Sequence, residues 1–174
     1  MLKYDLVEIL RPLIIEALAT LGLTDFEVLD HNQFTKQQLE NHTITFQIIN
    51  DKKIGFRQSQ NILYPELKQK YTQKKEIIFQ LMCFLKEDIE DLTLTSNDIL
   101  SRVALFFTTE NILIALNVNN IGFARESEVR EIPIRDAGEN YIICSSIDLI
   151  LVTDDSFEIG IKEIEQVNQT LKRI

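Results

Sequence analysis

Residues 75–85 have the sequence KEIIFQLMCFL. Its apolar side chains occupy both alternating sets of positions, whereas a strand with one solvated face is apolar on one set only. The stretch therefore predicts a central β-strand that is covered on both faces. The rest of the chain must then supply the neighbouring strands and the helices that cover the sheet.

The residues before this strand predict one helix and two short strands. Apolar residues recur at spacings of three and four along residues 3–21, which is the pattern of one helix face, and Gly22 supplies the stop. Pro12 lies inside this run, so the helix either kinks there or begins near Leu10; the unbroken apolar period favours the kink. Alternating patterns predict strands at Phe26–Leu29 and Thr43–Ile49.

The residues after the central strand predict a pair of helical segments. Thr95 or Ser96 can cap the first segment, and Asp98 lies in its first turn, where the helix dipole favours an anion. The predicted buried face of this helix consists of Ile99, Leu100, Val103, Phe106 and Phe107. A second helical or turn segment opens at Thr109 or Asn111 and covers residues 112–116.

The last third of the chain has the pattern of β-structure. Strands are predicted at residues 121–134, 141–152 and 157–167. Turn residues at 136–138 and 153–156 predict antiparallel hairpins at both joints. We therefore expect an α+β domain spanning residues 1–174, with a mostly antiparallel sheet of five to six strands and two or three helices on one face.

Charge is distributed very unevenly along the chain. Residues 52–75 carry seven of the eighteen basic residues and one acid, so the other 150 residues carry a formal charge near −15. Such a division points to surfaces with different partners, because unlike charges steer association. The basic residues, which are the predicted partner-binding or subunit-binding residues, are Lys52, Lys53, Arg57, Lys68, Lys70, Lys74 and Lys75.

The segment around these bases shows no sustained period of either kind. Gly55, Pro65 and many Gln, Asn, Ser and Lys residues predict a long basic arm or loop over residues 50–74. A loop of this length inside a compact domain is either functional or disordered. The clustered charge favours a contact arm that orders on a partner, with a solvated loop as the alternative.

The composition argues against several environments and partners. A net charge of −9 repels phosphate and disfavours DNA binding. Cys83 and Cys144 lie in apolar runs, which predicts buried, reduced thiols rather than a disulfide. We expect no signal peptide at residues 1–10, no membrane span, and synthesis in a reducing cytoplasm.

The sequence offers no constellation of residues for catalysis or cofactor binding. His31 and His42 have no further donors at metal-ligand spacing, and neither cysteine has a neighbouring histidine to activate it. The acidic runs at residues 87–91 and 154–158 are typical of solvated turns. Glycine-rich phosphate-binding motifs are missing. We therefore predict a protein that is not an enzyme and has no catalytic residues, metal or cofactor.

The order of these segments resembles a known family. A starting helix is followed by the strand ITFQI at residues 44–48, a Gln-rich segment, REIPIRD at residues 130–136, Tyr141, and IDLILV at residues 147–152. This pattern resembles the tail or neck terminator proteins of tailed bacteriophages and prophages. The resemblance implies a structural virion protein that forms a homohexameric ring, caps the tail tube and joins it to a connector or head-completion protein. It also implies assembly in the host cytoplasm and DNA that passes through the lumen without specific binding.

Two alternatives remain beside this interpretation. One is a head-completion or tail-completion protein, which joins head and tail with a different ring stoichiometry. The other is a protein-interaction module unrelated to phages, or an enzyme whose site residues are dispersed along the sequence.

Overall fold

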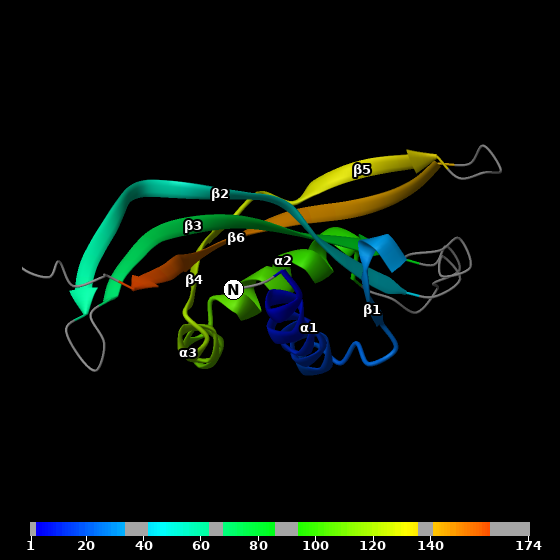
Figure 1. Ribbon diagram of the computed structural model, residues 1–174. Helices are drawn as coiled ribbons and strands as arrows, with labels where there is room; N and C mark the ends of the chain where they lie inside the picture. Colours follow the sequence, from blue (N-terminus) through cyan, green and yellow to red (C-terminus); the bar gives the residue numbers. More distant parts are fainter. Residues whose placement is uncertain (1–2, 34–41, 63–67, 86–93, 136–140, 161–174) are drawn as a thin grey trace, which may run out of the picture.

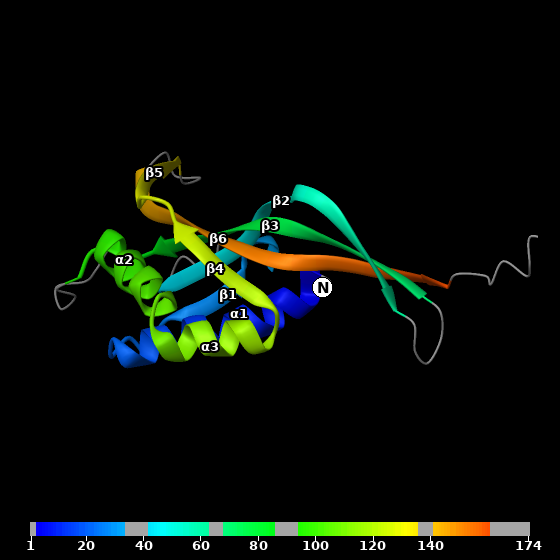
Figure 2. The ribbon, with the colours of Figure 1, turned by 90° about the vertical axis from the view of Figure 1, so that its left-hand side faces the viewer.

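The computed structural model describes residues 3–33, 42–62, 68–85, 94–135 and 141–160. They form a six-stranded mixed sheet with helices on one side (Figures 1 and 2). The elements are α1 (Lys3–Thr20), β1 (Glu27–Asp30), the 3-10 turn η1 (His31–Gln33), β2 (Thr43–Ile62), β3 (Lys68–Phe84), α2 (Ser96–Phe107), α3 (Glu110–Val118), β4 (Ile121–Glu126), β5 (Arg130–Arg135) and β6 (Tyr141–Gly160). The predicted α+β class is confirmed.

The predicted central strand lies in the middle of the sheet. The strand order is β1-β2-β3-β6-β4, and β5 also pairs with β6. The β1–β2 pair is parallel, and the other pairs are antiparallel. We call the side of the sheet that the helices cover the helix face and the opposite side the open face.

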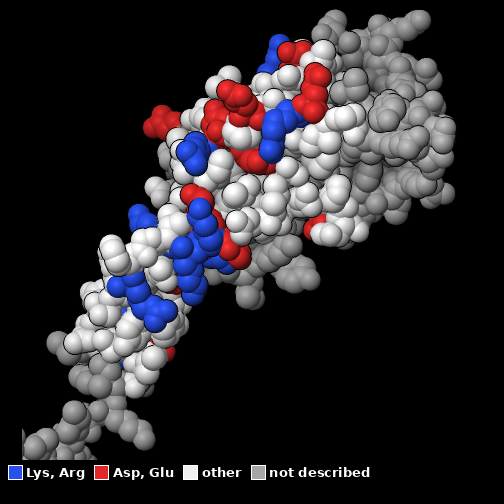
Figure 3. All heavy atoms as spheres, turned by 90° about the horizontal axis from the view of Figure 1, so that it is seen from above, with Lys and Arg blue, Asp and Glu red and all other residues white. Residues whose placement is uncertain are grey.

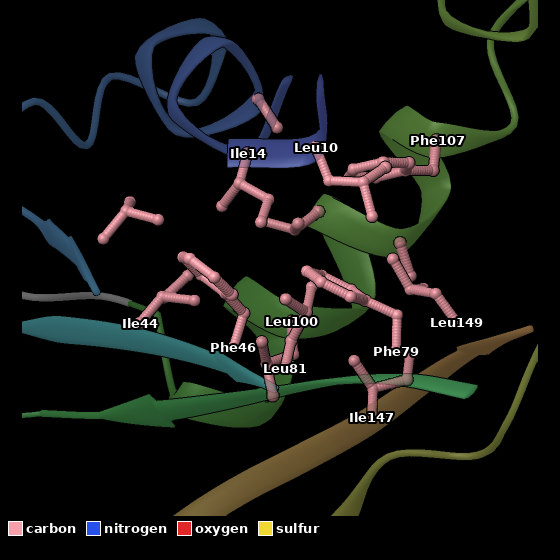
Figure 4. Close-up of a cluster of buried hydrophobic side chains, with 14 of the residues drawn as sticks. Leu10, Ile14, Ile44, Phe46, Phe79, Leu81, Leu100, Phe107, Ile147 and Leu149 are labelled. Carbon is pink, nitrogen blue, oxygen red and sulfur yellow. The ribbon is translucent and has the colours of Figure 1, made fainter. Parts of the chain in front are cut away.

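The core fills the space between the helices and the helix face. Alternate residues of β3 and β6 point into it and meet α1 and α2 (Figure 4). Leu10, Ile14, Phe79, Leu100 and Leu149 are all fully buried there. Because these side chains come from both ends of the sequence and from its middle, the chain folds around one core.

The predicted helices are confirmed, and the structure shows which of the two candidate residues, Thr95 or Ser96, caps α2. Thr95 is the N-cap of α2: its hydroxyl accepts from the Asp98 N–H at 3.1 Å, and the Asp98 carboxylate accepts from the Thr95 N–H at 3.0 Å. These two bonds form a capping box. The Thr95 hydroxyl also donates to the Asp98 carboxylate at 2.6 Å, and this bond, followed by the bond from the Thr95 N–H, lowers the pKa of Asp98. α1 runs unbroken through Pro12.

The prediction of separate strands at residues 141–152 and 157–167 was wrong. β6 is continuous from Tyr141 to Gly160, and residues 153–156 pair in register with β3 instead of turning. The local preference of residues 153–156 for a turn is weaker than the stabilisation they gain by pairing with the long strand β3.

The single strand predicted at residues 121–134 is also two strands. β4 and β5 both pair with the same edge of β6, at Leu149–Thr153 and at Tyr141–Ser146 respectively. Between them Ser127 interrupts the ladder, because its hydroxyl accepts the N–H of Asp148 at 3.0 Å. The predicted antiparallel hairpin between β5 and β6 is confirmed by their pairing, although residues 136–140 lie outside the described residues.

Candidate assembly surface

The predicted loop over residues 50–74 is strand wherever the structure describes it. Residues 50–62 continue β2, and residues 68–74 begin β3. β6 pairs along the other side of β3 as far as Gly160. Together residues 50–62, 68–76 and 152–160 form what we call the three-stranded arm, which extends beyond the helices (Figures 1 and 2).

The seven predicted basic residues all lie on this arm but divide between its faces. Strand alternation places Lys52, Lys68, Lys70 and Lys74 on the open face, and Lys53 and Lys75 on the helix face. Arg57 joins the helix face, with its guanidinium 5.7 Å from the ring centre of Phe157. Figure 3, which looks onto the open face, shows basic side chains gathered along the arm and acids mostly on the body.

Acids of the arm neutralise part of this charge. Lys53 contacts Asp155 at 2.8 Å, Lys75 contacts Asp51 at 2.5 Å, and Lys52 contacts Glu76 at 3.5 Å. In the whole arm five acids (Asp51, Glu76, Asp154, Asp155 and Glu158) accompany the seven bases. The linear charge count missed this compensation because three of these acids come from β6, far along the sequence.

The Lys53–Asp155 contact is formed at neutral pH. The hydrogen bond from Lys53, followed by the charges of Lys53 and Lys75, lowers the pKa of Asp155. A lowered pKa in the folded state means that the contact is present at neutral pH and is lost as the pH falls through that pKa. Because Lys53 and Asp155 are both largely exposed, the pair contributes little to overall stability.

Apolar and aromatic side chains accompany the charges. Tyr71 and Phe157 stack on the helix face of the arm with ring centres 5.1 Å apart. Phe157, Ile159 and Phe56 are 45%, 51% and 96% exposed. Large apolar side chains exposed beside charged residues are typical of a surface that is covered in an assembly.

A bulge in β2 gives the arm an irregular edge. Residues 55–57 of β2 lie opposite Gln73 alone, because the register shifts between Ile54 and Gln58. Gly55 has a φ of 70° there, a conformation that other residues adopt only under strain. The Gln73 side chain donates to the Gly55 carbonyl at 3.1 Å and holds the bulge in place.

A polar row crosses the open face between the arm and the far end of the sheet. Gln47 donates to Gln80 at 2.9 Å, Gln80 donates to Asp148 at 3.0 Å, and Arg130 donates to Asp148 at 2.6 Å. Asp148 is thus engaged by two donors at once. We assign this row a structural role, because its hydrogen bonds tie β2, β3 and β6 to the start of β5.

The histidines and acids provide no metal site in the described part of the chain. No group of three or more His, Cys, Asp or Glu residues is placed there to hold an ion. His42 stacks on Phe26, and His31 lies 3.3 Å from the Thr45 hydroxyl. The acidic run at residues 87–91 falls outside the described residues.

Within the described ranges no single helix is long and apolar enough to cross a membrane, although α2 and α3, bent by 64°, together meet the same test.

Both cysteines are buried free thiols, as predicted. Burial raises the pKa of Cys83 far above its usual value and that of Cys144 to about 11. At pH 8 the fraction of Cys144 present as thiolate is then about 10⁻³. We expect both thiols to react with a disulfide reagent at pH 8 only on unfolding, so that labelling is slow in buffer and fast in denaturant. Rapid labelling of the native protein would contradict the burial of these thiols.

Sequence reasoning missed the contribution of β6 to this surface. Asp155 was placed in a turn, and Phe157 and Glu158 beyond it, yet all three pair with β3 along the arm. The signal was present, because the apolar phase of Ile147, Leu149 and Leu151 continues without a shift at Phe157 and Ile159.

Comparison with models of protein families gives a match over most of the chain. The family model described as E217 gateway protein gp29 matches residues 5–162, which covers the body and all three strands of the arm. A comparison with curated proteins gives no significant match. The match confirms the expected phage neck region, whereas the finer assignment to the tail terminators stays a prediction. The chain belongs to the family of the E217 gateway protein gp29, a family of phage structural proteins of the neck region.

Proposed function

We propose that this protein is a tail terminator, a structural protein that forms a ring, caps the tail tube and joins it to the connector or a head-completion protein. The ring contains six copies and carries no catalytic activity. The observation that carries the proposal is the three-stranded arm, a charged and partly apolar extension of the sheet in a chain of the gateway protein family. An extension of this kind suits contact with a neighbouring protein better than it suits stability of the body.

The overall charge supports the same role. A ring through which DNA passes benefits from an acidic channel, because negative charge repels phosphate. The chain is strongly acidic at −9, and seven of its eighteen bases lie on the arm. We propose that the open face of the arm binds the acidic surface of a tail-tube protein, while the acidic body faces the DNA path.

The experiment measures attachment of the ring to purified tail-tube protein by co-sedimentation. We expect the double variant Lys70→Gln/Lys74→Gln to bind the tube protein at least about tenfold more weakly, because each lost contact is repeated around the ring. These lysines lie on the central strand of the arm, so the double variant tests binding through the open face and leaves both edges of the arm unchanged.

The matched control is Arg11→Gln/Arg102→Gln, which removes the same charge from exposed positions on α1 and α2. It should bind the tube protein as the unmodified protein does. Equal binding by the two double variants at physiological salt would overturn the role of the arm. Failure of the unmodified protein to attach to the tube protein would overturn the terminator role itself.

A further inference from the structure

The two edges of the three-stranded arm are open in the described part of the chain. β1 pairs with β2 only at residues 43–46, which leaves the outer edge of β2 without a described partner strand over residues 50–62. β4 pairs with β6 only as far as Thr153, which leaves the outer edge of β6 without one over residues 154–160. A row of unpaired backbone groups is a template for another strand.

These edges carry opposite charge. The β2 edge has Lys52, Lys53 and Arg57 against the single acid Asp51, whereas the β6 edge has Asp154, Asp155 and Glu158 and no base. Two β2 edges brought together would place bases opposite bases, and two β6 edges would place acids opposite acids. The charges therefore favour a β2 edge against a β6 edge and oppose symmetric pairing of like edges.

The strand directions fix the geometry of such a contact. β2 and β6 are both antiparallel to β3, so both run toward the same end of the arm. Copies related by rotation about an axis along the arm would therefore pair β2 with β6 in parallel. Different surfaces meet in such a contact, so it generates a closed ring when the rotation closes.

The rows of the sheet bring the charges near one another. Ile54, Lys74 and Asp154 share one row across the arm. With no shift in register between copies, Lys53 of one copy would lie level with Thr153 of the next, one residue from Asp154, and Arg57 would lie level with Asp155. Cross-strand neighbours at this spacing interact directly.

Edge charges and bulges also protect single proteins against unwanted pairing, and the bulge at residues 55–57 fits that role. The exposed Phe56, Phe157 and Ile159 do not fit it, because a protected edge avoids large apolar side chains. Edge charges and a bulge beside exposed apolar side chains are better explained by an edge that a second copy of the chain covers.

We infer that copies of this chain assemble head to tail by parallel pairing of the acidic β6 edge of one copy with the basic β2 edge of the next. This inference rests on the proposed ring and names the surfaces that close it. The ring is then held by backbone hydrogen bonds between arms, with the charges selecting the correct pair of edges.

The test uses two variants, in each of which the β2 edge and the β6 edge carry charge of the same sign. Asp154→Lys/Glu158→Lys makes both edges basic, and Lys52→Glu/Arg57→Glu makes both acidic. We expect each variant alone to remain monomeric in sedimentation velocity at 0.15 M salt, roughly physiological ionic strength. Mixing the two should restore the assembly of the unmodified protein, because every contact then joins opposite charges.

Controls with the same change in net charge lie on the helices. Glu8→Lys/Glu110→Lys and Arg11→Glu/Arg102→Glu alter exposed positions of α1, α2 and α3 and should assemble normally. Circular dichroism checks that all variants keep their secondary structure. Misfolded arms could not regain assembly on mixing. Recovery of assembly would therefore show that the single variants fail because of their edge charges and not because their arms are misfolded.

Three results would overturn the inference, and they are distinguishable. If the unmodified protein assembles and both edge variants still assemble alone, the edges are not the interface and the ring proposal survives. If both variants are monomeric and mixing them does not restore assembly, the inferred pairing of the β2 edge with the β6 edge is wrong. If the unmodified protein is monomeric at every concentration, with and without tail-tube protein, the proposed function itself fails.

Discussion

Replacing Phe79 by alanine is expected to lower the free energy of unfolding by about 3–5 kcal/mol. Phe79 is fully buried on the central strand, and its ring stacks on Phe46 with centres 5.6 Å apart. Figure 4 shows it pointing from β3 into the core, where α1 and α2 cover the sheet. Truncation removes this apolar contact and leaves a cavity that the surrounding strands and helices close only in part.

Phe56→Ala provides the matched control, because it makes the same chemical change at a side chain that is 96% exposed. Its effect on unfolding should stay within about 0.5 kcal/mol. Urea denaturation followed by circular dichroism measures both variants. Similar midpoints for the two would mean that the sheet and helices do not share the core described above.

The second large effect is expected at Ser145, whose replacement by alanine should cost about 1–3 kcal/mol. The Ser145 and Ser96 hydroxyls lie 2.7 Å apart and are both buried, one on β6 and one in the first turn of α2. Removing one hydroxyl leaves the other without its partner in the interior. The double variant Ser96→Ala/Ser145→Ala should therefore lose less than the sum of the single changes.

Ser146 lies next in the chain and makes the opposite prediction. Its hydroxyl is buried on the open face and has no hydrogen-bond partner within the described residues. Ser146→Ala should leave stability unchanged or raise it by up to about 1 kcal/mol, because a buried polar group without a partner is removed. Equal losses at both serines in the same urea experiment would contradict the assigned hydrogen bonds.

The body of the fold could be predicted from the sequence because its pattern is local. Three patterns each predict a local structure from a few neighbouring residues. They are the run at residues 75–85 that is apolar on both faces, the helical spacing in α1 and the capping residues of α2. Each of these elements has one consistent place to bury its apolar face. The α+β class and the helices on one side follow from them.

The arm could not be predicted in the same way because its strands depend on one another. Both faces of residues 50–62 are largely exposed, so no alternating pattern marks them as a strand. Their conformation is set by pairing with β3, which is itself held by β6 on the other side. The sequence alone marks the seven bases as one group along the chain, but their division between two faces and their acidic neighbours needed the register of the sheet.

The proposed closure of this protein into a ring can be tested by measuring its mass in solution. Light scattering after gel filtration would follow the mass across a series of protein concentrations, with and without tail-tube protein. We expect a mass near six subunits, or a monomer that tail-tube protein drives to six. A monomer at every concentration that ignores the tube protein would contradict the proposed ring.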